Sequence, residues 1–392
     1  MRALRFLTAG ESHGPALMVT LDGLPAGLEI DLDAVNAMLR RRMGGYGRGP
    51  RMTSIESDTV EVQGGIRHGR TLGSPVCLRI ENKDFANWRE AMSPAPVPEG
   101  TKKREVTRPR PGHADLAGAL KYDTHDVRDI LERASARETA ARTAAGALAV
   151  QFLKQFSVMI ASHVVRVGNA AYPPGHEVPF VDITNISTES PLRVADEDLE
   201  KDMIAVIDAV AAEKDTIGGA FEVVAAGVLP GLGSHRHWDT KLDGRLAQAI
   251  MSIPAIKAVE IGAGIHAASS RGTAIHDEIL RSGRWKSFSR RTNRAGGMEG
   301  GISNGGEIRV RGYMKPLSTL KKPLASVDVN TKESFKAAVE RTDITAISSA
   351  GVVGEAMTAL VLADAFMEKF GGDSMTEVAR NVRGYRTQLQ KY

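Results

Sequence analysis

A chain of 392 residues in which 42% are hydrophobic is long enough to bury a large core, and with only 5% aromatic residues that core must be mostly aliphatic. The net charge of +4 excludes a strongly basic, histone-like protein, but the Lys and Arg residues lie in patches that attract anions, either phosphorylated metabolites or nucleic acid. The single cysteine, Cys77, excludes an intrachain disulfide, and it lacks the Cys and His neighbours of a zinc site, so no metal is expected. We find neither a signal peptide nor a run of about 18 apolar residues that would cross a membrane, so we expect a soluble, cytoplasmic protein without membrane contacts.

The chain begins with a predicted strand within residues 1–19, which leads into the polar loop 10–14. Loops bounded by glycines after a strand are common positions for functional sites, so we interpret His13 either as a site residue or as a hydrogen-bonded structural histidine. A second strand is predicted at 17–24, and Asp31 is expected to cap the helix that follows.

That helix ends in the cations Arg40, Arg41 and Arg42, and a glycine-rich segment with Arg48 and Arg51 follows. Cations are favourable at a helix C-terminus, which explains the first three without a ligand. We interpret the segment after them as a mobile cationic loop. RNA binding is the alternative, although this loop offers a single tyrosine for stacking on bases.

Residues 60–80 predict two or three short strands, and residues 92–112 predict an exposed connection rich in proline and cations. Two prolines stiffen the end of this connection and Gly112 permits a turn, so His113 is presented on a fixed backbone. A surface histidine without a function is the alternative.

An Ala-rich helix is predicted from residue 126 to about residue 156. Arg133 and Arg137 are four residues apart and would share one face of it. One interpretation is a solvated face with acidic partners. The other is a buried helix start that receives a phosphorylated ligand, with the two guanidinium groups and Ser135 as donors.

The second half of the chain repeats features of the first. An amphipathic helix is predicted at 196–214, with its apolar face in the core or in a subunit contact. After it, residues 219–232 resemble residues 14–28, and residues 350–370 resemble residues 134–156, at nearly equal separations. We infer two copies of one unit, approximately 1–214 and 215–392, in a single integrated domain spanning 1–392. Chance matches at Gly and Pro turns are the alternative.

Two later segments are candidates for ligand contacts. Six glycines between residues 292 and 306 indicate either flexibility or a backbone packed on a flat or anionic ligand. After a predicted strand at 308–310, the segment 315–319 places a lysine beside two hydroxyl groups, which suits a phosphate or a solvated turn. Arg341 and Asp343 then precede a second Ala/Val-rich helix.

Taken together, these motifs resemble the chorismate synthase family, and in particular its monofunctional members. Seven segments carry the resemblance in the family's order, namely 10–14, 44–49, 110–115, 133–142, 215–219, 292–305 and 315–319. No segment resembles the dinucleotide-binding Gly-x-Gly-x-x-Gly fingerprint after a strand.

The resemblance implies a lyase that converts 5-enolpyruvylshikimate 3-phosphate to chorismate and phosphate by anti-1,4-elimination, the last common step of the shikimate pathway. It also implies reduced FMN as cofactor, although the reaction has no net redox change. FAD and NADP are the other cofactors associated with such flavoproteins, with NADPH as an indirect electron source and an external flavin reductase as a partner. The implied fold is α/β (α+β), a β-α-β sandwich, and the implied assembly is a homotetramer.

The resemblance also implies roles for individual residues. His13 and His113 match the family's two acid histidines, one for the leaving phosphate and one for the reduced flavin, and Asp343 matches a carboxylate that relays a proton from the flavin. The substrate or NADP contacts are Arg42, Arg48, Arg51, Arg110 and Arg137. The FMN contacts are Arg133, Ala134, Ser135, His266, Ala267, Gly300, Lys315, Pro316, Leu317, Ser318, Thr319 and Arg341. The sequence departs from the family's usual residues at Ala263, His266 and Leu317, which puts only local FMN contacts in doubt.

Two other functions compete with the lyase. A basic RNA-binding protein would use the same Arg patches, but it predicts interleaved aromatic residues, and these patches contain only Tyr46, Trp285 and Phe288. A flavin-dependent oxidoreductase that turns over NADPH would need a nicotinamide site, for which the sequence gives no independent signal.

Overall fold

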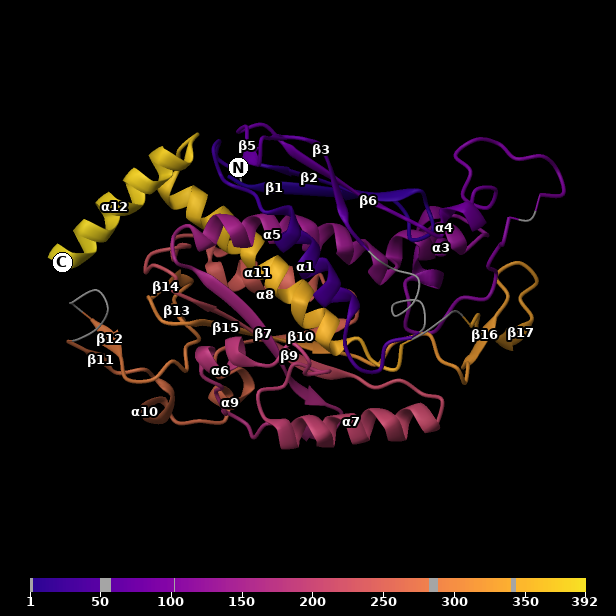
Figure 1. The fold of residues 1–392 in the computed structure, drawn as a ribbon. Helices are drawn as coiled ribbons and strands as arrows, with labels where there is room; N and C mark the ends of the chain where they lie inside the picture. The colour runs from indigo at the N-terminus through magenta and orange to yellow at the C-terminus, as the bar shows by residue number, and fades with distance from the viewer. Residues whose placement is uncertain (1–2, 50–57, 102, 282–287, 340–342) are drawn as a thin grey trace.

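Two antiparallel sheets enclose a layer of helices (Figure 1), in a computed structural model that describes residues 3–49, 58–101, 103–281, 288–339 and 343–392. The helices of the inner layer are α1 (Leu32–Met43), α5 (Thr139–Lys154), α8 (Leu242–Met251) and α11 (Ile347–Phe370). The chain therefore has the mixed α/β sandwich that the sequence predicts.

The first sheet has the strand order β1-β2-β6-β3. Its strands are β1 (Arg5–Ala9), β2 (Ala16–Asp22), β6 (Val76–Glu81) and β3 (Val60–Gly64), and two short strands, β4 (Ile66–Arg67) and β5 (Arg70–Thr71), form a hairpin beside them. Leu17, Val19 and Leu21 alternate along β2 and are at most 2% exposed, so this face of the sheet packs on the helices.

The second sheet has the order β10-β15-β9-β7-β8. Its strands are β10 (Ile256–Ile261), β15 (Ile308–Met314), β9 (Gly219–Ala226), β7 (Met159–Val167) and β8 (Ala170–Ala171). The central strand β9 is buried on both faces, because α11 covers one face and the segment with α6 (Phe180–Asn185) covers the other. Helix α7 (Glu197–Ala212) lies along β7 and β8, capped by Asp196.

The inner helices approach one another closely because they carry small residues at their contact. A Cβ atom on Gly146 of α5 would overlap the backbone of Ala356 on α11. Helix α11 is long and apolar enough to cross a membrane by length and composition. However, 94% of its apolar window is buried inside the protein, so it is a core helix.

The single helix expected from residue 126 to residue 156 is broken. Helix α4 (Arg128–Ala134) ends at Ser135, whose backbone is extended at φ −62° and ψ 139°. A 3-10 turn, η2 (Ala136–Glu138), and then α5 follow. The Ser135 hydroxyl accepts a hydrogen bond from the Arg137 amide, and such capping competes with helix continuation. Arg133 and Arg137 therefore do not share a helix face.

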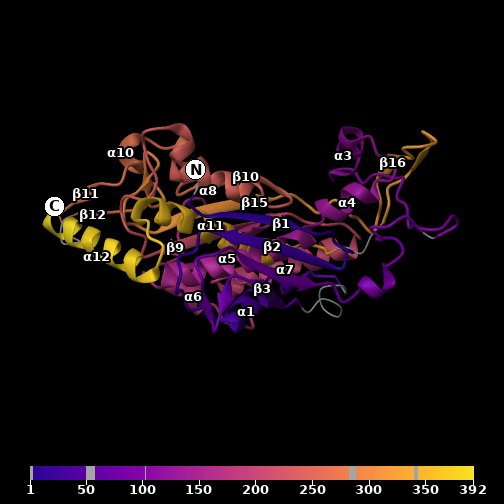
Figure 2. The same ribbon diagram turned by 90° about the horizontal axis from the view of Figure 1, so that it is seen from above.

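The remaining elements gather at the two ends of the molecule (Figures 1 and 2). Helices α3 (Asp115–Tyr122) and α4 lie at one end with the hairpin of β16 (Ala325–Val327) and β17 (Ser334–Lys336). Toward the other end lie α9 (Gly264–Ala268), α10 (Gly272–Ile275), α12 (Met375–Lys391) and the short hairpins β11 (Ile279–Leu280) with β12 (Ser289–Arg290) and β13 (Met298–Glu299) with β14 (Ile302–Ser303).

Candidate active site

A cavity of about 750 Å³ lies at the end of the molecule that carries α4. Among the described residues, its wall carries six Lys and Arg side chains and two Asp side chains: Arg42, Arg48, Arg104, Arg110, Arg137, Lys315, Asp84 and Asp343. Both predicted acid histidines, His13 and His113, line the same cavity. The cavity is therefore strongly cationic and contains two groups that can exchange protons near neutral pH.

His13 is held by the loop between β1 and β2. Gly10 starts this loop at φ +100°, where a Cβ atom would overlap the carbonyl oxygen of Ala16. The Glu132 carboxylate accepts the His13 amide N–H at 2.8 Å and lies 2.9 Å from the ring atom Nδ1. The Ser12 amide donates to the Glu132 carbonyl at 3.0 Å, so the loop is tied to α4 at three points.

The ring of His13 also packs on Trp88, with ring centroids 3.8 Å apart. The Trp88 indole N–H donates to Asp84 at 3.0 Å, and the Arg104 guanidinium lies 4.1 Å from the centroid of the indole ring. This stack limits the rotation of the His13 ring.

His113 is held at the start of α3. Its Nδ1 is hydrogen-bonded to the fully buried carboxylate of Asp115. Arg110 donates to the same carboxylate from Nε at 2.9 Å and from Nη2 at 3.1 Å, and it reaches Thr319 from Nη1 at 3.1 Å. Burial alone raises the pKa of Asp115, but the hydrogen bonds from His113 and Arg110 outweigh it and hold the pKa well below the usual range.

Two of the predicted substrate-binding arginines share one carboxylate. Asp58 pairs with Arg42 at 3.0 Å and with Arg137, and all three side chains are at most 5% exposed. Burial raises the pKa of Asp58, but the two guanidinium groups outweigh it, so the net shift is downward.

Arg48 and Asp343 form a second pair on the wall, 2.7 Å apart. Asp343 also accepts the Gly49 amide N–H at 2.6 Å. The predicted relay carboxylate is therefore joined to a predicted substrate contact.

Half of the twelve residues predicted to contact FMN line the cavity as well: Ala134, Ser135, Lys315, Leu317, Ser318 and Thr319. The Lys315 ammonium donates to the Gly112 carbonyl at 2.6 Å, which ties the segment 315–319 to the loop of His113. Burial, with a smaller effect of Lys257, lowers the pKa of Lys315. Ser135 is hydrogen-bonded to Ser12 at 3.2 Å.

Other residues predicted to contact FMN or the substrate do not line this cavity in the single chain described. The Arg133 side chain is 41% exposed and donates to the carbonyl oxygens of Thr8 and Gly10. Pro316 is exposed on the segment 315–319 and does not line the cavity. Arg51 and Arg341 lie outside the described residues.

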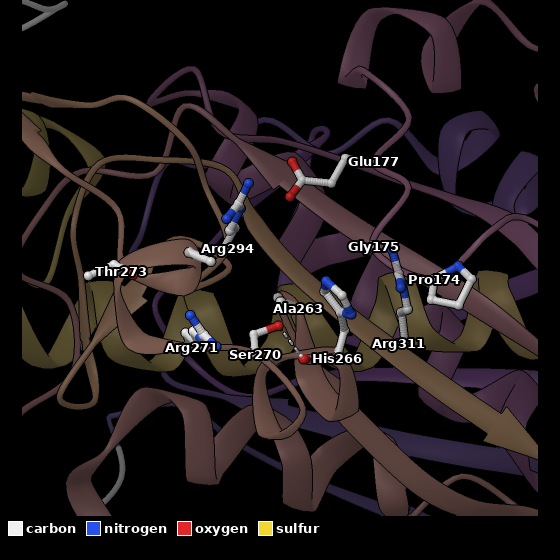
Figure 3. A pocket seen from close by; sticks show the side chains of 12 residues that line it. Pro174, Gly175, Glu177, Ala263, His266, Ser270, Arg271, Thr273, Arg294 and Arg311 are labelled. Atoms are coloured by element: carbon white, nitrogen blue, oxygen red, sulfur yellow. Dashed lines mark hydrogen bonds between the residues drawn. The ribbon is translucent and has the colours of Figure 1, made fainter.

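His266, Ala267 and Gly300 lie in a different part of the molecule from the cavity. Figure 3 shows His266 with Arg271, Arg294, Arg311 and Glu177 around a second cavity of about 480 Å³. The larger cavity contains Ala255, just before β10, and the second contains Gly262, just after β10, so the six-residue strand separates them by about 20 Å. Ala267 belongs to the same short helix as His266, and Gly300 lies in the hairpin of β13 and β14.

The sequence did not identify several residues of the site. Trp88, Asp84 and Leu131 line the cavity, and Glu132 and Asp115 hold the two histidines. The sequence could have indicated Asp115, because it lies two residues after His113 in a matched motif. No sequence pattern indicated Trp88 or Asp84, because they come from an irregular segment far from the other residues along the chain.

The RNA-binding alternative requires exposed cations. Arg42, Arg110 and Arg137 are only 3%, 9% and 7% exposed and lie around a cavity instead of along a surface stripe. This placement favours a small anionic ligand.

Comparisons with known proteins show which family the chain belongs to. The family model for chorismate synthase matches residues 4–367. The chorismate synthase of Symbiobacterium thermophilum is 52% identical over 392 residues, covering 99% of this chain and 100% of that protein. That of Desulforudis audaxviator is 53% identical over 389 residues, covering 99% of this chain and 98% of that protein. A crystal structure of a chorismate synthase matches with a TM-score of 0.80 at 39% identity over 100% of both chains.

The matches extend over nearly the whole chain, and the chain places His13 and His113, the two histidines predicted to act as acids, in one cationic cavity. The chain therefore belongs to the chorismate synthase family, and its enzymatic activity is that of a chorismate synthase.

Proposed function

We propose that the cavity of about 750 Å³ binds 5-enolpyruvylshikimate 3-phosphate together with reduced FMN and releases phosphate by anti-1,4-elimination. The observation that carries this proposal is the presence of His13 and His113, each on a buried carboxylate, in a single cationic cavity. The volume lies within the range of roughly 300–1,000 Å³ that small-molecule sites occupy.

The charges of the wall fit these ligands. The substrate carries a phosphate and two carboxylates, and FMN carries another phosphate, so both need guanidinium and ammonium donors. Arg42, Arg48, Arg110 and Arg137 offer such donors to the substrate. Lys315, Ser318 and Thr319 offer an ammonium and two hydroxyl groups to the flavin phosphate.

Side chains of the protein itself transfer the protons in this reaction. When bound, reduced FMN supplies transient electron density that helps to expel phosphate without net oxidation. His13 then gives a proton to the departing phosphate, and His113 holds a proton beside the flavin. Asp343 takes up the proton that the substrate loses at C6, as the relay group beside the flavin, and Arg48 keeps this carboxylate oriented on the wall.

An anaerobic assay tests this proposal. Purified chain with chemically reduced FMN and substrate should release phosphate and chorismate in equal amounts, and oxidised FMN should give neither product. His13→Ala and His113→Ala should each lower kcat by about 10²- to 10⁴-fold, the usual contribution of a general acid.

The matched control is His237→Ala. His237 also pairs with a carboxylate, Asp239, at 2.6 Å, but it is 65% exposed and lies outside the cavity. Its removal should leave kcat unchanged. If FMN binds but no product forms with reduced flavin, the lyase proposal is wrong and a flavin oxidoreductase becomes the better description.

We also propose that the chain works as a homotetramer in which His266, Ala267 and Gly300 contact the flavin of a neighbouring subunit. The support is their distance from the cavity within one chain, which leaves another subunit's cavity as the place for the predicted contact. Mixing inactive His13→Ala chains with inactive His266→Ala chains should restore part of the activity if the site is shared. Sedimentation analysis reports the assembly independently.

The internal duplication is a further proposal about the fold. In its support, the order β1-β2-β6-β3 matches the order β7-β9-β15-β10, and α1 then matches α8 and α5 matches α11. In this alignment the second unit begins with β7, so its boundary lies before residue 159 and not at residue 215. The repeated phenylalanines also meet: the ring centroid of Phe366 is 5.6 Å from that of Phe152 and 4.6 Å from that of Phe156.

For the electron supply, we propose a monofunctional enzyme in the cytoplasm whose flavin is reduced by an external NADPH-dependent reductase. The family model accounts for residues 4–367, which leaves no reductase-sized segment within these 392 residues. Adding NADPH and oxidised FMN to the purified chain should give no chorismate until a flavin reductase is added.

A further inference from the structure

We propose that Glu132 with Arg128, and Asp115 with Arg110, are positioning residues that hold the Nδ1 side of His13 and His113 so that Nε2 of each ring exchanges protons in the cavity. This proposal rests on the proposed function for its catalytic consequence. Its structural content, the ring tautomer, can be measured without turnover.

The first step concerns the ring of His13. The Glu132 oxygens lie 2.9 and 3.0 Å from Nδ1, and one of them also accepts the His13 amide N–H. An ionised carboxylate only accepts hydrogen bonds, so Nδ1 must carry a proton. In the neutral ring Nε2 is then the unprotonated nitrogen, and it is the atom that gains and loses the exchanged proton.

The second step concerns the carboxylate. Arg128 donates to Glu132 at 2.9 Å from one turn earlier on α4, and Glu132 is 3% exposed. Burial raises the pKa of Glu132, but the hydrogen bonds from His13 and then Arg128 outweigh it, so the net shift is downward. Glu132 therefore stays ionised at neutral pH and remains an acceptor for Nδ1–H.

The third step is the recurrence of this arrangement at His113. The Asp115 carboxylate is in hydrogen-bond contact with the His113 Nδ1, and Arg110 holds both carboxylate oxygens while its Nη2 lies 3.1 Å from the same Nδ1. The ionised carboxylate accepts the Nδ1 proton, as at His13. The two carboxylates come from different positions relative to their histidines, one two residues later and one on a distant helix. The same contact at two independent positions in one cavity indicates a shared requirement.

A buried histidine outside both cavities provides a contrast. His163 contacts Glu222 through Nε2 at 3.3 Å, and Arg309 holds the same carboxylate at 2.8 Å. Its Nδ1 has no hydrogen-bond partner among the described residues, and it lines neither described cavity. A buried carboxylate on Nδ1 thus distinguishes the two cavity histidines from His163, and also from His237, whose Nδ1 partner Asp239 is exposed.

The fourth step concerns the charges around His13. Glu132 and Arg128 face it from α4, and Trp88 covers one side of its ring, with Arg104 and Asp84 in contact with that indole. Glu132 is the carboxylate in hydrogen-bond contact with the ring. Replacing Glu132 by a neutral residue should disfavour the protonated form of the His13 ring. The neutral ring should then no longer be held in the Nδ1–H tautomer.

The test uses ¹⁵N-histidine NMR on wild-type chain and on Glu132→Gln. The neutral His13 ring should be the Nδ1–H tautomer in wild type and should shift toward Nε2–H in the variant, because a glutamine amide can donate to Nδ1. The midpoint of the kcat–pH profile should move to lower pH. We expect kcat to fall by about 10- to 100-fold, the usual effect of removing an orienting partner, with KM within about twofold.

Three further variants test this interpretation. Glu132→Asp retains the charge and should keep the wild-type tautomer, and Asp115→Asn should reproduce the tautomer change at His113 even if a Glu132 variant folds poorly. Asp239→Asn, beside the exposed His237, should leave the tautomers of His13 and His113 and the value of kcat unchanged. An unchanged His13 tautomer and pH profile in folded Glu132→Gln would overturn the proposal. Wild-type chain with the expected tautomers but no lyase activity would instead overturn the proposed function.

Discussion

Individual charged residues of the cavity wall are paired with carboxylates. Asp58 partly neutralises Arg42 and Arg137, and Asp343 is paired with Arg48. Buried cations without a partner would be costly, so these carboxylates stabilise the folded chain. They also reduce the positive charge that an incoming phosphate meets.

Asp58 therefore links stability to ligand binding. We expect Asp58→Asn to lower the free energy of unfolding by about 3–5 kcal/mol, because two buried guanidinium groups lose their counterion. At the same time, binding of inorganic phosphate should become tighter at low salt. Chemical denaturation and phosphate titration measure the two effects.

The control for this change is Asp22→Asn. Asp22 pairs with Arg5 at 3.4 Å, but the two side chains are 46% and 62% exposed. Such surface pairs contribute about 0–1 kcal/mol, so this variant should be close to wild type. Equal effects of the two substitutions would contradict the role given to Asp58.

Among the elements, the contact between α5 and α11 is the most demanding. Gly146 lies against Ala356 with no room for a side chain, and this contact joins a helix that packs on β2 and β6 to one that packs on β7 and β9. Helix propensity alone favours alanine over glycine, so packing and propensity act in opposite directions at this position.

We expect packing to dominate at Gly146. Gly146→Ala should lower the free energy of unfolding by about 1–3 kcal/mol, the usual effect of overpacking a core. Gly384 on α12 is the matched control, because a Cβ atom there meets nothing within 4 Å. Gly384→Ala should stabilise the chain by up to about 1 kcal/mol, and thermal melts of both variants should move in opposite directions.

Across the whole molecule, buried carboxylates that pair with cations make the free energy of unfolding depend on pH. Burial raises the pKa of Glu222, but His163, Arg311 and Arg309 outweigh this and lower it to about 2 from 4.5. The pKa values of Asp58, Asp115 and Glu132 are also lowered. A lowered pKa in the folded chain means that the stabilisation is present above the unfolded pKa and is lost as the pH falls.

We expect the free energy of unfolding to fall as the pH is lowered from about 4.5 toward 2, with roughly 3 kcal/mol coming from Glu222 alone. Denaturant titrations at pH 7 and pH 3 measure this loss. Glu222→Gln should be less stable at pH 7, because Arg309 and Arg311 lose their counterion, but its stability should change less over the acid range. A wild-type stability that is constant between pH 5 and pH 2.5 would contradict this account.

The sequence by itself determined the local elements and much of the site. Asp31 caps α1 as predicted, the amphipathic helix predicted at 196–214 is present as α7, and alternating apolar residues mark β2. These features depend on neighbours within a few residues, so they can be read along the chain. The matched motifs also identified His13 and His113, because the loops that carry them are short and self-contained.

Only the tertiary structure decided which distant groups meet. The break at Ser135 is hidden in an Ala-rich run, and the pairing of Glu132 with His13 spans 119 positions along the chain. Asp58, Trp88 and the separation of His266 from the cavity likewise follow from how the two sheets enclose the helices. Local patterns encode periodicity and caps, whereas contacts between distant segments depend on the packing of the whole chain.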